Sequence, residues 1–442
     1  MPLVFVHGVN TRNTDDDYAR SVAARRTMFE HYVVPKLRSG FPAFAVAEDI
    51  YWGDLGVDFA WSLRSVPATK LLQSLGPADG GGLNLDILAV AADATSAPSG
   101  VQSLGAEQPL VAAAKKDPAG LVRAVFATDA DKFAPREMSP RSAPIDPATA
   151  KKAASEGEHL GLMLIAADLF ADDAAAKPEL VAGATDSEVL DKIKDGVTGR
   201  YRQLVEQRNK AAAAAVVQHL GEGGNPIGWV TDHLSNLLDA AKEATKSAAA
   251  TTGRAANLLL LKGMRDGLSR RTLRFIGDVF VYLHHGKTRN PAIFDRVKSG
   301  LLAINGRRND QGEREPYILV THSFGSEIIY DLLTSGALSD LTIDLWVTVG
   351  AQTSLFAEML LYDKLPVIPA NTSDFVLGRP ANVNKWINIY DAADVLSYLH
   401  EPIFGKEAVA DIQIRAQANT TNAHGHYFLV PDFFQKIADA IV

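Results

Sequence analysis

The chain has 442 residues, of which 47% are hydrophobic and 22% are charged, and its formal net charge is −8. This length and composition are typical of a globular protein with a large core. The excess of acidic residues gives no electrostatic reason to expect nucleic acid as a partner. Because the chain contains no cysteine, disulfides, thiolate metal sites and cysteine nucleophiles are all excluded.

The start of the chain carries neither a basic stretch nor the longer apolar stretch of a secretion signal. Residues 1–7, Met-Pro-Leu-Val-Phe-Val-His, instead lead directly into an apolar strand. No run of about 18 apolar residues follows elsewhere in the chain. We therefore expect a cytoplasmic protein without a membrane-spanning helix.

A strand–helix–strand unit is predicted at the beginning. The first strand covers Leu3–His7 and is followed by Gly8, Val9 and Asn10, where glycine and asparagine favour a turn. A helix is expected to start after the aspartates at 15–17 and to end before Gly40. Phe44–Trp52 then predicts the second strand, so that residues 1–55 form the first part of an α/β core.

Residues 56–270 lack the strand–helix alternation of their surroundings, and they are too many for a structureless connection. Periodic apolar positions predict helices over Tyr201–Leu220 and Val230–Leu261, whereas Asp79–Gly82 and Asp129–Pro147 indicate flexible links. We predict a large, mainly helical insertion here and call it the cap. It could close a substrate cleft, touch a bilayer or bind a partner protein.

The most informative pattern lies within Pro316–Ile329, after a helix predicted to begin at Asn290. A β-branched strand runs through Thr321-His-Ser-Phe-Gly325 into an amphipathic helix. A sharp turn of this kind lifts the hydroxyl of Ser323 clear of the backbone. It requires small residues two positions before and two positions after the serine, and these are Thr321 and Gly325.

The rest of the chain continues the alternation of strands and connecting segments. Two acidic residues, Asp391 and Asp394, follow one of the predicted strands, and two histidines, His424 and His426, precede the final helix. The predicted elements are strands over Leu341–Val349, Trp386–Tyr390 and Val409–Arg415 and a helix from about Pro431 to Ile441.

Thr321-His-Ser-Phe-Gly325 resembles the G-x-S-x-G nucleophile elbow of α/β-hydrolases, with threonine in place of the first glycine. The His-Gly pair, the later aspartates and the final histidines follow in the order of that family. The resemblance covers residues 1–55 and about 271–442 and lacks the usual antiparallel edge strands. It implies an α/β-hydrolase fold, a mostly parallel sheet flanked by helices, with the helical cap of residues 56–270 inserted between the two parts of the core.

The resemblance also implies a catalytic triad of Ser323, Asp394 and His424. Ser323 is then the nucleophile, His424 its general base, and Asp394 the carboxylate that orients the imidazole. The sequence leaves Asp391 open as an alternative acid and His426 as an alternative base.

Backbone N–H groups of Val9 and Phe324 are expected to form the oxyanion hole, with Asn10 as an alternative to Val9. This chemistry requires no metal and no organic cofactor.

Because the motifs resemble lipases more than peptidases, we expect a carboxylic ester or lipid-like substrate, with phospholipids included. A serine peptidase or amidase, and a non-catalytic scaffold whose cap contacts a protein or a membrane, stay open as alternatives. The sequence does not indicate an oligomeric state.

Overall fold

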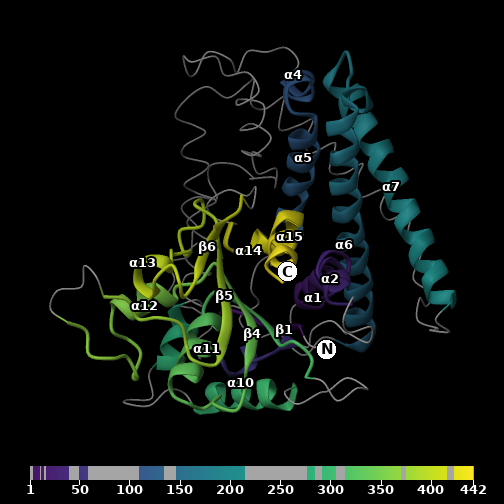
Figure 1. The fold of residues 1–442 in the computed structure, drawn as a ribbon. Helices are drawn as coiled ribbons and strands as arrows, with labels where there is room; N and C mark the ends of the chain where they lie inside the picture. The colour runs from purple at the N-terminus through teal and green to yellow at the C-terminus, as the bar shows by residue number, and fades with distance from the viewer. Residues whose placement is uncertain are drawn as a thin grey trace, which may run out of the picture.

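A computed structural model describes residues 3–9, 11–13, 16–38, 49–57, 109–133, 146–214, 276–283, 291–304, 314–369, 375–415 and 423–441. Within these residues the chain forms a six-stranded, wholly parallel sheet that is flanked by helices (Figure 1). The α/β class predicted from the sequence is therefore confirmed.

The strands lie side by side in the order β2-β1-β3-β4-β5-β6. Nearly all residues of β1, β3 and β4 are buried, as expected for parallel strands that are covered on both faces. The bounds are Leu3–Val6 for β1, Asp49–Ile50 for β2, Ile318–His322 for β3, Ile343–Val349 for β4, Val383–Tyr390 for β5 and Ala410–Gln413 for β6. The second strand is thus shorter than the predicted Phe44–Trp52 within the described residues.

Helices cover both faces of the sheet, and a further helix spans residues 276–283. The bounds are α1 Asp16–Tyr32, α2 Val34–Arg38, α4 Pro109–Lys116, α5 Pro118–Phe133, α6 Pro147–Ala176, α7 Asp186–Ala214, α10 Pro291–Ile304, α11 Gly325–Thr334, α12 Thr353–Glu358, α13 Glu401–Phe404, α14 Ala423–His426 and α15 Pro431–Ala440, with 3-10 turns at Gly53–Leu55, Pro178–Leu180 and Tyr427–Leu429. Among these described helices, none combines the length and the apolar character needed to cross a bilayer.

Strand β1 shows how the two faces are built. Leu3 and Phe5 join the hydrophobic cluster of α1 and α15, whereas Val4 and Val6 join the cluster of α10 and α11 on the opposite face. Successive side chains of a strand point to opposite faces, so this four-residue strand contributes to both cores.

The strand order changes direction between β1 and β3. β1 leads into α1 on one face and β3 leads into α11 on the other, so the two connections diverge (Figure 1). In an open parallel sheet such a point leaves a crevice at the carboxyl ends of the strands. Gly8 and Ser323 follow these two strands and therefore meet there.

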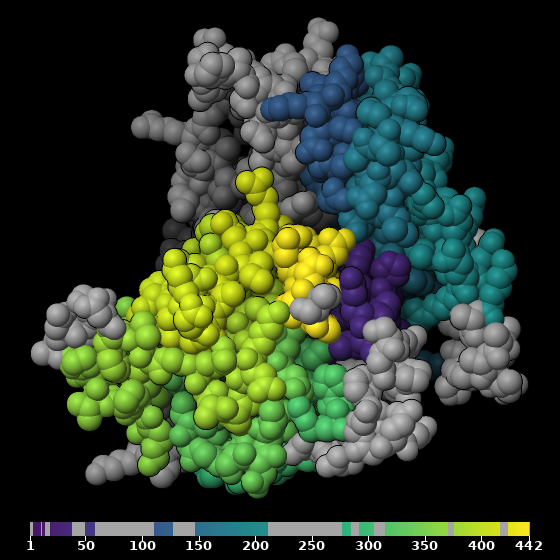
Figure 2. All heavy atoms as spheres, viewed as in Figure 1, coloured from purple at the N-terminus to yellow at the C-terminus, as the bar shows by residue number. Residues whose placement is uncertain are grey.

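The described helices within residues 56–270 pack on the helices that flank the sheet through α6, which lies along α1. A Cβ at Gly157 would overlap the carbonyl group of Arg20, and a Cβ at Gly161 would lie 2.8 Å from the side chain of Thr27. Two glycines one turn apart thus allow the helices to approach closely. In Figure 2, α15 lies against α1, and α5 to α7 continue the same layer upward.

The bounds of the link predicted over Asp129–Pro147 differ in the structure, since α5 continues to Phe133 and α6 begins at Pro147. Residues 134–145 of this link lie outside the described residues. The side chain of Asp146 caps α6 by accepting hydrogen bonds from the first turn, and Pro147 is its first residue, as is common at the start of a helix.

Other predictions within the cap have mixed outcomes. Residues 201–214 of the expected helix Tyr201–Leu220 form the end of α7, which starts earlier than predicted, at Asp186. Val230–Leu261 and Asp79–Gly82 lie outside the described residues. The boundaries of the cap at 56 and 270 stay predictions.

We expect Gly325→Ala to destabilise the protein. A Cβ at Gly325 would lie 2.6 Å from the carbonyl oxygen of His7 and 2.8 Å from that of Val6, where α11 begins against the end of β1. Overpacking against the backbone costs about 1–3 kcal/mol, to be measured by urea unfolding. Gly199 of α7 is the control, since an added Cβ there meets no atom within 4 Å. Gly199→Ala should be neutral or stabilising, and equal losses for both variants would contradict the expectation.

Candidate active site

Ser323 lies on the turn between β3 and α11 in a conformation that few residues adopt. Its φ is +50°, in the left-handed region that is costly for residues other than glycine. The Ser323 N–H donates to the carbonyl oxygen of Val349, and the Ser323 carbonyl accepts from the Ser326 N–H, both at 2.9 Å. Hydrogen bonds on both sides thus hold the strained residue in place.

Thr321 stands where the family pattern has its first glycine. Its buried hydroxyl is hydrogen-bonded with the hydroxyl of Ser326 at 2.8 Å and accepts from the indole N–H of Trp346 at 3.0 Å. The first of these bonds joins the last part of β3 to the first turn of α11. Threonine therefore fits this position, and its hydroxyl adds a hydrogen bond across the turn.

The structure brings Ser323, His424 and Asp394 together from three separate segments. Nε2 of His424 lies 2.8 Å from Oγ of Ser323, and its Nδ1 lies 2.9 Å from Oδ2 of Asp394. The side chain of Asp394 is 1% exposed and that of His424 is 22% exposed. A carboxylate at Nδ1 selects the tautomer that carries hydrogen there, which leaves Nε2 free to accept the proton of Ser323.

Two donors besides His424 hold the carboxylate of Asp394. Its Oδ2 also accepts from the hydroxyl of Tyr427 at 2.8 Å, and its Oδ1 accepts from the N–H of Leu396 at 2.9 Å. Burial by itself raises the pKa of the Asp394 carboxyl. The hydrogen bond and charge of His424, together with the other two donors, outweigh burial and bring the pKa below its ordinary value. The carboxylate is therefore ionised at neutral pH.

The two alternatives left open by the sequence lie outside this hydrogen-bond chain. Oδ1 of Asp391 accepts from the N–H of Ala393, and the Asp391 N–H donates to the hydroxyl of Tyr427. His426 is buried at the end of α14 and takes no part in the bonds that join Ser323 to Asp394.

Gly8 brings the end of β1 against the serine. A Cβ at Gly8 would lie 2.6 Å from Cβ and 3.2 Å from Oγ of Ser323, so a larger residue does not fit. Among the described residues, no hydrogen bond uses the N–H of Val9 or of Phe324 as donor. Unused N–H groups beside a serine are what an oxyanion hole requires. Asn10, the alternative donor, lies outside the described residues.

Gly350 and Gln352 lie against the candidate triad, although no sequence motif pointed to them. Gly350 has a φ of +55°, and a Cβ there would lie 3.1 Å from Oδ2 of Asp394 and 3.3 Å from Nδ1 of His424. The side-chain amide of Gln352 donates to the carbonyl oxygens of Gly350 at 2.7 Å and Leu396 at 2.6 Å. This amide joins the end of β4 to the loop that carries Asp394.

His322, directly before the serine, contacts the backbone of the candidate base. Its Nε2 lies 2.8 Å from the carbonyl oxygen of His424, and the two rings are 4.8 Å apart. Burial, with a smaller contribution from the charge of His424, lowers the pKa of His322 to about 3. The imidazole is therefore neutral at pH 7, and its Nε2–H donates to that carbonyl.

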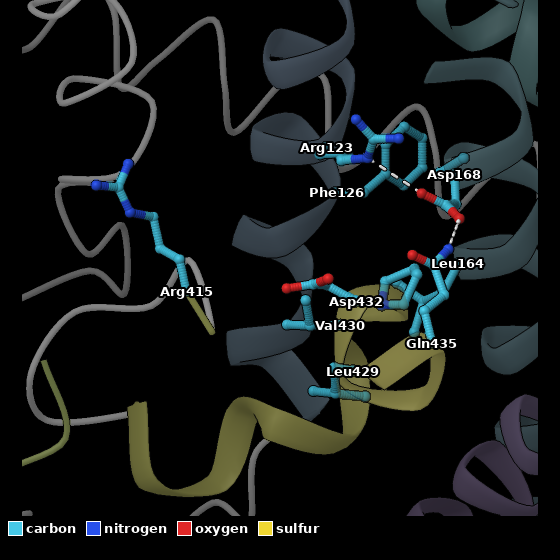
Figure 3. Close-up of a pocket in the computed structure, with 11 residues that line it drawn as sticks. Arg123, Phe126, Leu164, Asp168, Arg415, Leu429, Val430, Asp432 and Gln435 are labelled. Atoms are coloured by element: carbon cyan, nitrogen blue, oxygen red, sulfur yellow. Dashed lines mark hydrogen bonds and ion pairs between the residues drawn. The ribbon is translucent and has the colours of Figure 1, made fainter. Parts of the chain in front are cut away.

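A cavity of about 380 Å³ lies apart from these residues, between α5, α6 and the turn before α15 (Figure 3). None of the triad residues lines it. The carboxylate of Asp168 in its wall accepts from Nε of Arg123 at 3.1 Å and from Nε2 of Gln435 at 3.2 Å. Three polar side chains of this wall, those of Arg123, Asp168 and Gln435, are therefore hydrogen-bonded to one another.

Comparison with known proteins found no protein-family model, no curated protein and no solved structure that matches the chain. The resemblance to α/β-hydrolases therefore stays a prediction from the motifs.

We expect Tyr427→Phe to make the protein less stable at neutral pH and to make its stability depend less on acid. The variant loses a donor to Asp394, which raises the pKa of that carboxyl towards its unfolded value, and it removes the hydroxyl that accepts from the N–H of Asp391, at a cost of roughly 1–3 kcal/mol. A carboxylate with a lowered folded pKa stabilises the protein above its unfolded pKa and loses that contribution as the pH falls through the folded value. Because the folded and unfolded pKa values lie closer together in the variant, this loss should be smaller than in the wild type, as measured by urea unfolding across a pH series.

The matched control for this measurement is Tyr390→Phe, which removes an exposed hydroxyl that donates to Gln413 at 3.4 Å. It should leave both stability and its pH dependence nearly unchanged. If Tyr427→Phe has the pH profile of the wild type, its hydroxyl does not set the ionisation of Asp394.

Proposed function

We propose that the chain is a serine hydrolase with an α/β-hydrolase fold, and that it cleaves carboxylic esters through an acyl-enzyme. The hydrogen-bond chain from Asp394 through His424 to Ser323, at a strained strand-to-helix turn, carries this proposal. The parallel sheet with helices on both faces is consistent with that fold. In this proposal residues 56–270 are the cap.

In the first half-reaction, Oγ of Ser323 attacks the ester carbonyl carbon while Nε2 of His424 takes the hydroxyl proton. Asp394 keeps the imidazole in the required tautomer and stabilises the imidazolium that forms. The N–H groups of Phe324 and Val9 donate to the oxyanion. His424 then passes its proton to the departing alcohol, which leaves the acyl group on Ser323.

In the second half-reaction, His424 takes a proton from water, and the water oxygen attacks the acyl carbon. The same two N–H groups donate to the second oxyanion. Collapse of this intermediate breaks the bond to Oγ, and His424 returns the proton to Ser323. Ester plus water thus give acid plus alcohol, with the enzyme unchanged and no cofactor consumed.

Esters are proposed rather than amides because the motifs around His7 and Ser323 resemble lipase-like proteins. The same triad also cleaves amides when the site protonates a leaving amine. Parallel assays with short-chain esters, lipid vesicles and peptide libraries separate these substrate classes. Cleavage of peptides without cleavage of any ester would contradict the ester proposal and favour the peptidase alternative.

A fluorophosphonate reagent should label the protein at Ser323, because such reagents require a serine activated by a base and an oxyanion hole. Ser323→Ala should abolish labelling and lower kcat by roughly 10³-fold or more. Intact mass and peptide mapping locate the label. Ser335→Ala is the control, since that hydroxyl lies at the far end of α11, where it donates to the carbonyl oxygen of Leu332 at 3.0 Å and accepts from the N–H of Ala337 at 3.3 Å. Full turnover by pure Ser323→Ala would exclude the mechanism, and folded wild-type protein that is not labelled would favour the scaffold alternative.

Asp394→Asn should lower kcat by roughly 10³–10⁴-fold, because the amide can donate to Nδ1 and so favours the wrong tautomer of His424. Asp391→Asn keeps the oxygen that accepts from Ala393 and should leave kcat nearly unchanged. Steady-state kinetics at saturating substrate measure both effects. The opposite pattern would identify Asp391 as the acid.

A further inference from the structure

The loop after β1, which carries Val9, is anchored at its far end by a buried ion pair. Nη2 of Arg12 donates to Oδ1 of Asp278 at 2.7 Å, and Nη1 donates to Oδ2 at 3.1 Å. The side chain of Asp278 is fully buried and that of Arg12 is 14% exposed. Two parallel hydrogen bonds to one carboxylate fix both the position and the plane of the guanidinium.

The same pair also joins the start of the predicted cap region to the helix that follows it. Oδ1 of Asp278 accepts from the N–H of Val57 at 2.7 Å, and Nη2 of Arg12 lies 3.3 Å from the Val57 carbonyl oxygen. Val57 lies near the start of residues 56–270, and Asp278 belongs to the helix at 276–283, shortly after their end. A Cβ at Gly56 would overlap the Asp278 carboxylate. Three distant segments therefore meet at one buried contact.

The near end of the loop is fixed by His7. Nε2 of His7 accepts from the N–H of Trp52 at 3.0 Å, so its Nδ1 carries hydrogen and donates to the carbonyl oxygen of Gly8 at 2.6 Å. Burial lowers the pKa of His7 to about 3, which keeps the imidazole neutral. Carbonyl and N–H groups of a trans peptide point in opposite directions, so the Val9 N–H is directed away from His7.

We propose that Arg12 and Asp278 are positioning residues for the oxyanion hole, and this inference rests on the proposed function. Only residues 9–11 separate the peptide oriented by His7 from the guanidinium held by Asp278. In this proposal the two anchors act together, so that a displacement of Arg12 strains the short loop and shifts the N–H of Val9. An oxyanion donor must lie about 2.7–3.1 Å from the oxygen that develops charge, so a small displacement weakens its contribution to the transition state.

Two conservative variants test this role. Arg12→Lys keeps the charge but replaces the fork by a single ammonium group, and Asp278→Asn keeps the shape but loses the charge. We expect each to lower kcat about 10-fold, less than the roughly 10²–10³-fold cost of removing a donor altogether. KM should stay within about 2-fold, and the rate of fluorophosphonate labelling should fall in parallel with kcat.

The double variant Arg12→Lys/Asp278→Asn adds a second measurement. Because both residues act through one contact, its loss of kcat should be no larger than that of the worse single variant. Arg20 and Glu156 provide the control, since they form another partly buried ion pair, at 2.9 Å, between α1 and α6 and away from the loop. Glu156→Gln should leave kcat and labelling unchanged even where it lowers the melting temperature.

The outcomes distinguish this inference from the proposed function. Wild-type protein labelled at Ser323, with folded Arg12→Lys and Asp278→Asn variants that turn over and label at the wild-type rate, would overturn only the positioning role. A fall in melting temperature without a fall in kcat would do the same. Folded wild-type protein without any label at Ser323 would overturn the proposed function itself.

Discussion

The close contact between the end of β1 and the turn that carries Ser323 is the constraint on which the site depends. Gly8 lies against the side chain of Ser323, and Gly325 lies against the carbonyl oxygen of His7. Neither position has room for a Cβ. This approach places the end of β1 beside the hydroxyl of Ser323, at the point where the connections of β1 and β3 diverge. Backbone geometry thus sets one half of the site.

Buried hydrogen bonds set the other half, and they begin on α11, the helix that follows Ser323. Glu327 of α11 accepts from the N–H of Gln352 at 2.9 Å, and Gln352 in turn joins Gly350 to Leu396 in the loop of Asp394. Burial raises the pKa of Glu327 to about 8, so the carboxyl is mainly neutral at pH 7 and costs less to bury. Helix α11 therefore begins at the turn of Ser323, and Glu327 in its first turn holds the loop of Asp394 through Gln352.

What the sequence predicts well is local. Thr321–Gly325 could be recognised because a strand, a turn and a helix follow within a few residues, and the parallel strands follow from short apolar runs. No such local pattern points to Gln352, since its role lies in a contact with Leu396, 44 residues away. The choice between Asp394 and Asp391 stayed open for the same reason, because tertiary geometry decides which carboxylate reaches the imidazole. In α6, glycines that are unfavourable for an isolated helix are explained only by the presence of α1.

The two ends of the predicted cap, residues 56–270, lie close together. Asp278, in the helix at 276–283 that follows this region, accepts from the N–H of Val57 at its start. The entropy cost of closing a loop grows only slowly with its length. A long insertion between two such adjacent ends therefore leaves the sheet register intact. Because the ends meet beside the loop after β1, the place that tolerates the insertion is also the place where it can influence the candidate oxyanion hole.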